Sequence, residues 1–279
     1  MSDLGFLPAW TTVTFPVSGV VTHVWLPPLV AFVVSFFTSM VGISGAVLLL
    51  PFQVSVLHFV TPAVSATNLV FNLVAIPGGV WRYIREGRMH WPLTRIIVIG
   101  TLPGIVIGYF LRIAWLPDPA SFKRFVGWVL LYLAVRLLAD PGLRKTAAPP
   151  ADNPECHFHK GGMLLLAGVV GVIGGIYGIG GGAIIAPFCV TLFRLPVHAI
   201  AGATLMGTFL TSVVGVLLYS LLPAPPGLPT APDWALGALF GLGGLGGMYL
   251  GARCQKFVPQ KWLKWLLGGM LTLLALHYV

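Results

Sequence analysis

Two glycine-rich segments carry the residue types of this chain that are best suited to chemistry. They are Gly42–Gly45, which reads GISG, and Gly178–Gly182, which reads GIGGG, and each lies inside a long apolar run. Glycine releases a helix, and a helix that restarts after such a break presents unpaired N–H groups and about half a positive charge. Two breaks of this kind predict a site for an anion.

Hydroxyl and amide side chains near both segments supply further donors. Asn68 and Asn72 are four residues apart and share one helical face, so they rank first among these donors. The predicted binding residues are Gly42, Ser44, Gly45, Thr67, Asn68, Asn72, Tyr177, Gly178, Gly180, Gly181, Gly182, Thr204 and Thr208, with Ser65, Thr211 and Ser212 as further candidates. Small residues also let membrane helices approach closely, and that alternative explains Gly104, Gly108, Gly243 and Gly247.

Two cationic positions follow the glycine segments at corresponding places. His58 and Arg194 each lie a few residues after a proline, Pro51 and Pro187. They are candidates for a gate or for attracting an anion at the two mouths of the site, and interfacial snorkelling is the alternative. Cys189 reads as a small buried hydrophobe. Cys156, His157 and His159 have no fourth ligand, so we expect neither a metal site nor a cofactor.

The composition excludes a soluble globule. Of the 279 residues, 57% are hydrophobic and 8% are charged, whereas soluble domains carry about 25% charged residues. Between Asp3 and Arg82 no residue is acidic or basic apart from histidine. The net charge of +9 predicts basic cytoplasmic loops rather than a nucleic-acid partner. Three scattered cysteines predict no disulfide framework.

Eight apolar blocks of about membrane-spanning length follow one another along the chain. They cover residues 25–57, 63–81, 93–116, 124–140, 162–193, 199–222, 234–252 and 262–278. We divide the chain into an N-terminal segment (1–24), a first repeat (25–140), a hydrophilic linker (141–160) and a second repeat (161–279).

A shift of 136 residues reveals an internal duplication. It places VGISGAVLLLPF over YGIGGGAIIAPF, residues 41–52 over 177–188, with five of twelve positions identical. Repetition of this kind changes the expected fold. We therefore predict an all-α polytopic membrane protein built from a duplicated unit.

The first block of each repeat is too long for one straight membrane helix. Each contains a glycine break and a proline, which predicts a re-entrant hairpin followed by three transmembrane helices. That threading places thirteen basic residues on one side of the membrane and three on the other. Such a bias indicates a cytoplasmic basic side, inverted repeats, and both termini outside.

The paired GISGAVLLLPF and GIGGGAIIAPF blocks, with PAVSATN and AIAGATL after them, resemble the TauE/SafE family of sulfite and organosulfonate exporters and permeases. The resemblance covers the chain from about Trp25 onward. It implies a multi-pass protein of the cell inner membrane that carries small sulfur-containing anions such as sulfite, thiosulfate or sulfoacetate. The first repeat departs from the fuller GIGGG pattern, so the two sides of the site should differ chemically.

The placement of acidic residues bears on the mechanism. All seven lie at the ends of the apolar blocks or in loops, whereas ion-coupled carriers commonly use carboxylates within the membrane. We therefore expect potential-driven anion transport and no enzymatic activity. An anion channel of the same fold is the main alternative, and a membrane-embedded enzyme is a weaker one. The choice of anion, the direction of transport and the oligomeric state stay open.

Overall fold

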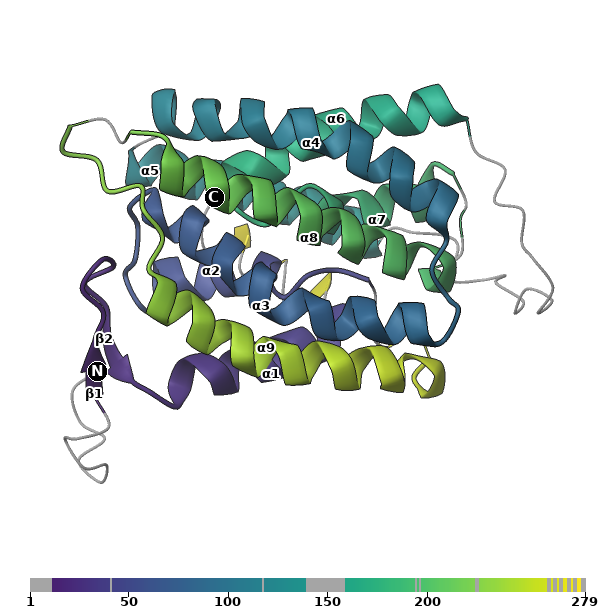
Figure 1. Cartoon of the computed structure of the whole chain (residues 1–279), viewed down its shortest axis with the longest axis horizontal. Coiled ribbons are helices and arrows are strands. Elements are labelled where there is room, and N and C mark those ends of the chain that lie inside the picture. Colours follow the sequence, from purple (N-terminus) through teal and green to yellow (C-terminus); the bar gives the residue numbers. More distant parts are fainter. Residues whose placement is uncertain are drawn as a thin grey trace.

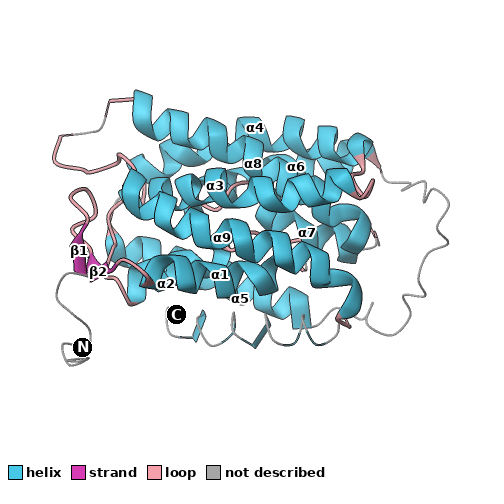
Figure 2. Cartoon of the chain, turned by 60° about the horizontal axis from the view of Figure 1, so that its bottom comes forward, coloured by secondary structure: helices cyan, strands magenta, loops and turns pink. Residues whose placement is uncertain are grey.

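The computed structural model describes residues 12–40, 42–116, 118–138, 159–193, 195, 197–223 and 226–259, with separate residues between 262 and 276. These residues form a bundle of helices with one small β-hairpin (Figures 1 and 2). The predicted all-α polytopic class is confirmed. The hairpin, β1 (Thr12–Thr14) and β2 (Val21–His23), is an addition, and its antiparallel strands pair Val13 with Thr22.

The first half of the chain contributes five helices to the bundle (Figure 1). They are α1 (Leu26–Ser39), α2 (Ala46–Ser55), α3 (Ala63–Arg85), α4 (Trp91–Ala114) and α5 (Pro119–Leu138). The second half contributes α6 (Lys160–Tyr177), α7 (Gly182–Thr191), α8 (Val197–Leu221) and α9 (Trp234–Cys254), followed by the short 3-10 helix η3 (Gln255–Phe257). Each long predicted block is thus divided into two helices at its glycine segment.

Several helices begin at a side chain that caps a free N–H group. Asp233 Oδ1 accepts from the Leu236 N–H at the start of α9 (3.1 Å), and His159 Nδ1 accepts from the Gly162 N–H at the start of α6 (3.0 Å). Such caps satisfy donors that lack an intrahelical partner. His159 therefore serves helix α6, while Cys156 and His157 lie outside the described residues.

Five of the described helices are long and apolar enough to cross a bilayer: α3, α4, α6, α9 and residues Ile200–Leu221 of α8. Helices α1 and α2, of 14 and 10 residues, are shorter. At about 1.5 Å per residue, neither spans a hydrocarbon core of about 30 Å by itself.

Helices α1 and α2 enter and leave at the same end of the bundle. The Ser18 hydroxyl, before α1, donates to Asp233 Oδ2 (2.9 Å), and the Ala63 N–H, after α2, donates to the Pro229 carbonyl (3.2 Å). Both acceptors lie in the connection between α8 and α9. The first long block is therefore a hairpin that turns back at its glycine segment.

Helices α6 and α7 form the matching hairpin. Cys189 Sγ, near the end of α7, lies 3.9 Å from Met163 Sδ, near the start of α6, and both residues are buried. The second block therefore also turns back at its glycine segment. Cys189 is a buried residue within this packing, as its sequence context predicted.

The first helix of each half packs against a helix of the other half. Helix α1 packs along α9 of the second half, and α6 packs along α4 of the first. A Cβ on Gly104 would lie 2.5 Å from the Gly168 carbonyl oxygen in α6, and one on Gly243 would collide with the Pro28 carbonyl in α1. The predicted packing role of these two glycines is confirmed, and the same holds one turn further along for Gly108 and Gly247.

Helices α3 and α8 pack against each other in the middle of the bundle and run in opposite directions (Figure 1). Tyr83 at the end of α3 faces Gly202 near the start of α8, while Leu69 near the start of α3 faces Gly215. Each of these helices also packs on an outer helix of the other half, since α3 packs on α9 and α8 packs on α4. The centre of the bundle is consequently built from both repeats.

Candidate functional site

Both glycine breaks adopt the left-handed backbone that glycine permits. The φ angles are +74° at Gly42, +79° at Gly178 and +78° at Gly180. A side chain at such a φ clashes with the following carbonyl, so the breaks need glycine here. The helices end and restart where the sequence predicted.

Each break packs on the central helix of the other repeat, and the two sets of contacts are equivalent. A Cβ on Gly42 would lie 2.7 Å from the Cα of Ala201 in α8, and one on Gly178 would lie 2.5 Å from the Cα of Ser65 in α3. The 136-residue offset that aligns the repeats relates both pairs. Neither break therefore has room for a larger residue.

Two hydrogen bonds across the centre of the bundle are related to each other by the same 136-residue offset. Thr204 Oγ1 donates to the Gly42 carbonyl (2.9 Å), and Asn68 Nδ2 donates to the Gly178 carbonyl (3.0 Å). Asn68 Nδ2 also donates to the Ala46 carbonyl (3.1 Å), so one amide joins both breaks. Asn68 and Thr204 are fully buried and hold the backbone of the break that they face.

Asn72 joins the breaks one helical turn further along α3. Its Nδ2 donates to the Ile179 carbonyl (3.0 Å) and to Ser212 Oγ (3.1 Å), while its Oδ1 accepts from the Ser44 hydroxyl (2.5 Å). All of these side chains are buried. The amide pair predicted from the sequence thus lies between the two breaks, where both amides are hydrogen-bonded to protein.

The remaining predicted residues of the second break also lie at the centre. Tyr177 donates its hydroxyl proton to the Val47 carbonyl (3.0 Å), and the Gly181 N–H donates to Thr211 Oγ1 (3.1 Å). Gly180 and Gly182 pack against Thr208 of α8, whose hydroxyl donates to the backbone of its own helix.

Three predicted residues lie away from the breaks or outside the described residues. Thr67 Oγ1 accepts from the Asp233 N–H (2.9 Å), so Thr67 supports the start of α9. His58 is exposed in the connection after α2, with a φ of 55°. Arg194 lies outside the described residues.

The breaks retain free backbone donors. Among the residues that the structure describes, the N–H groups of Ser44, Gly45, Gly180 and Gly182 have no hydrogen-bond partner. Ser44 and Gly45 immediately precede α2, and Gly182 is the first residue of α7. The N-termini of two short helices therefore supply donors that an anion can use.

Helix α1 adds two hydroxyl groups that the sequence reading missed. Ser35 Oγ and Thr38 Oγ1 are buried without a hydrogen-bond partner, and a Cβ on Gly45 would lie 2.6 Å from Ser35 Oγ. Their spacing of three residues, which puts both on one face of a helix, was the available signal. The first break therefore has hydroxyl groups from α1 beside it in addition to Ser44.

A family model described as the sulfite exporter TauE/SafE matches residues 28–278. The chain belongs to the TauE/SafE family. Two similar curated proteins of Bacillus subtilis (strain 168) are the probable membrane transporter proteins YunE and YjnA. YunE is 26% identical over 201 residues, which is 66% of this chain and 73% of YunE. YjnA is 25% identical over 251 residues, which is 85% of this chain and 92% of YjnA. No solved structure matches the chain.

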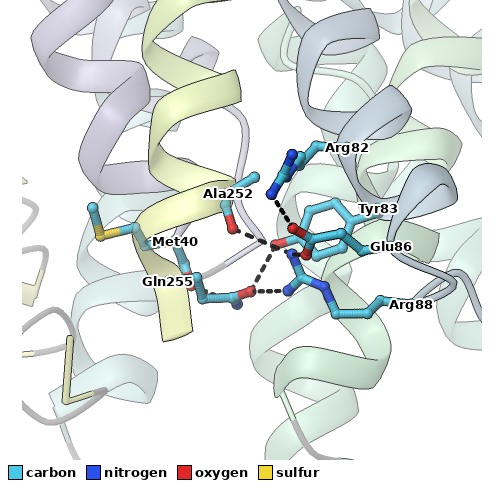
Figure 3. Close-up of polar contacts among 7 residues, drawn as sticks. All are labelled: Met40, Arg82, Tyr83, Glu86, Arg88, Ala252 and Gln255. Atoms are coloured by element: carbon cyan, nitrogen blue, oxygen red, sulfur yellow. Dashed lines mark hydrogen bonds and ion pairs between the residues drawn. The ribbon is translucent and has the colours of Figure 1, made fainter. Parts of the chain in front are cut away.

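In this TauE/SafE protein a polar network at one end of the bundle anchors Met40, two residues before Gly42 of the first break (Figure 3). Gln255 Nε2 donates to the Met40 carbonyl (2.8 Å), and Gln255 Oε1 accepts from the Tyr83 hydroxyl and from Arg88 Nη1, both at 3.0 Å. The Arg88 guanidinium lies 4.6 Å from the centre of the Tyr83 ring. The end of α1 is thereby tied to α3 and α9.

One carboxylate offsets part of the positive charge at this end of the TauE/SafE bundle. Glu86 forms ion pairs with Arg82 and Arg88. Burial raises the pKa of Glu86, but the Arg88 and Arg82 guanidinium groups outweigh that effect and hold the pKa below its usual range. Glu86 is therefore ionised at neutral pH and compensates part of the positive charge around it.

Proposed function

We propose that this TauE/SafE transporter carries small sulfur-containing anions such as sulfite, thiosulfate or sulfonates including sulfoacetate, bound between the two glycine breaks. The observation that carries the proposal is the meeting of two short helix N-termini whose N–H groups at Ser44, Gly45, Gly180 and Gly182 lack partners. Sulfur oxyanions offer several strong acceptor oxygens for such donors. The sulfite exporter named by the matching family model supports the same substrate class.

The repeats form an inverted pair in this proposal. Helix α3 runs antiparallel to its counterpart α8, and the exchanged packing of α1 on α9 and α6 on α4 supports the relation. Transporters with such repeats bind substrate near the midplane between broken helices. Access would alternate as the two hairpins shift relative to the central helices, because the contacts at Gly42 and Gly178 must open before an anion can enter.

The distribution of basic residues supports one orientation of the bundle in the membrane. Among the basic residues whose side chains the structure describes, the end that contains the connection between α3 and α4 has Arg82, Arg85, Arg88, Arg95, Lys160 and Arg253, and the other end has Arg112, Lys123 and Arg124. Positive residues favour the cytoplasm. The Glu86 network therefore lies at the cytoplasmic end, and the β-hairpin lies outside.

The driving force in this proposal is the membrane potential. None of the described helices contains Asp or Glu, so no carboxylate within them is available to carry a coupling proton or sodium ion. An inside-negative potential contributes about 2.3 kcal/mol per charge per 100 mV toward anion efflux. That energy corresponds to a ratio of about fiftyfold for a monovalent anion.

The test is flux in proteoliposomes that contain the purified protein. We expect saturable flux of sulfite, thiosulfate or sulfoacetate that responds to an imposed potential, and no response to potential for taurine, which is zwitterionic at neutral pH. Gly45→Leu and Gly181→Leu should abolish flux while the protein still inserts. Flux that ignores potential and follows a pH gradient would refute potential-driven transport. Counterflow would identify a carrier, and linear flux without counterflow would identify a channel.

A further inference from the structure

An arginine is buried at the end of the bundle opposite the Glu86 network. Arg112 lies in the last turn of α4 and is 0% exposed. Its guanidinium lies 3.7 Å from the centre of the Phe122 ring, Nε donates to Ser65 Oγ (3.4 Å), and Nη1 contacts the Leu116 carbonyl. The remaining nitrogen, Nη2, is buried with no hydrogen-bond partner.

Among the residues that the structure describes, no carboxylate compensates the positive charge of Arg112. Within the described ranges the two ion pairs join Glu86 to Arg82 and Arg88, and neither includes Arg112. Asp118, in the connection that follows α4, is exposed and caps the next helix by accepting from the Ser121 N–H (2.8 Å). A buried cation without a counter-charge is costly, so such groups are normally paired.

A second unpartnered donor lies beside this arginine. The Tyr219 side chain, near the end of α8, is 2% exposed, and its hydroxyl makes no hydrogen bond of ordinary geometry. The centre of its ring lies 4.7 Å from that of Tyr109, one turn before Arg112 on α4, and it is close to Arg112 and Ser65. Two buried donor groups, the charged Arg112 Nη2 and the neutral Tyr219 hydroxyl, therefore lie in one place without a protein acceptor of ordinary hydrogen-bond geometry.

A comparison of the two repeats shows which group is missing beside Arg112 and Tyr219. The 136-residue offset relates Tyr219 to Tyr83, and it relates Ile176 to Met40, which lie two residues before Gly178 and Gly42. At the first break the carbonyl of Met40 is held by Gln255, beside Tyr83. At the second break the carbonyl of Ile176 accepts from the Ser65 hydroxyl (3.5 Å), next to Tyr219.

The two ends differ in their counter-charge. At the Tyr83 end, Arg88 is paired with the carboxylate of Glu86. At the Tyr219 end, Arg112 is paired with no carboxylate in the part of the chain that the structure describes. The second end has the arginine and the tyrosine but lacks the anion.

We propose that Arg112 and Tyr219 form an anion-binding subsite at the outer end of the pathway, where the transported sulfur oxyanion supplies the missing negative charge. The inference rests on the proposed function. Ser65 connects the subsite to the central site, because it contacts both Arg112 and Gly178. A guanidinium offers planar paired donors that match two oxygens of an oxyanion.

The experiment compares Arg112→Gln, Arg112→Lys and Tyr219→Phe with wild type in proteoliposomes, using sulfite, thiosulfate and sulfoacetate as probes. Loss of a charged hydrogen bond should raise KM at least about tenfold in Arg112→Gln. Arg112→Lys should recover part of this loss, since it keeps the charge but not the planar donors. Tyr219→Phe should raise KM by a smaller factor. Arg124→Gln is the matched control, because it removes an exposed arginine at the same end and should leave KM unchanged.

Thermal unfolding separates binding from a structural role. Because Arg112 is buried without a counter-charge, Arg112→Gln should melt at the same temperature as wild type or higher, and the stabilisation that the anions give wild type should be lost. A lower melting temperature with anion stabilisation retained would assign Arg112 a structural role and overturn the subsite. Unchanged KM in Arg112→Gln, with wild type transporting, would also overturn it. If wild type itself neither transports nor is stabilised by any probe, the proposed function and the subsite both fail.

Discussion

Replacing Gly178 by alanine tests the close approach of the two repeats. The φ of +79° disfavours any side chain, which costs about 1–2 kcal/mol. The new Cβ would lie 2.5 Å from the Cα of Ser65, and overpacking of this kind costs about 1–3 kcal/mol more. Backbone atoms cannot rotate away as a side chain does. We therefore expect Gly178→Ala to lose about 2–5 kcal/mol of stability in total.

Gly42→Ala should behave similarly, since Gly42 has a φ of +74° and faces the Ala201 backbone. Gly87→Ala is the matched control. Gly87 has a φ of +66°, but a Cβ there meets nothing within 4 Å, so only the cost of about 1–2 kcal/mol for the backbone applies.

The assay combines thermal unfolding of the purified protein with anion flux in proteoliposomes. Gly42→Ala and Gly178→Ala should melt below Gly87→Ala and transport poorly, whereas Gly87→Ala should transport at the wild-type rate. If both break variants melted and transported like Gly87→Ala, the close packing of the breaks would not be a feature of the working protein.

Three further changes test single groups. Asn72→Ala leaves the Ile179 carbonyl and the Ser44 hydroxyl without their partner, so unfolding should become easier by about 2–4 kcal/mol, and an unchanged melting temperature would contradict the hydrogen bonds described. Ser35→Ala removes a buried hydroxyl that has no partner, so the melting temperature should stay the same or rise, and a clear fall would show a missed contact. The pKa of Glu86 is below its ordinary value of 4.5, so its ion pairs stabilise the folded state above about pH 4.5 and lose this effect as the pH falls through the folded pKa. Melting curves from pH 7 to pH 3 should therefore show a steeper loss in wild type than in Glu86→Gln, and parallel curves would refute the linkage.

Much of the helical architecture could be read from local signals. Apolar runs predicted the membrane helices, and the glycines at 42–45 and 178–182 predicted where two of the runs are interrupted. Both signals act within a few residues, because a helix depends on its own side chains and a left-handed φ depends on one residue. The β-hairpin was missed because three-residue strands carry almost no periodic signal.

The sequence by itself determined that the protein lies in a membrane, that it is duplicated, and that glycine interrupts one long block in each half. The tertiary structure decided what the polar groups do. Asn68 reaches the Gly178 carbonyl across 110 residues of chain, and Thr204 reaches the Gly42 carbonyl across 162. The same folding buries Arg112 without a counter-charge among the described residues, which its place near the end of the apolar block 93–116 did not determine. Partners this distant follow from how whole helices pack, and the residue spacing along one helix does not contain that information.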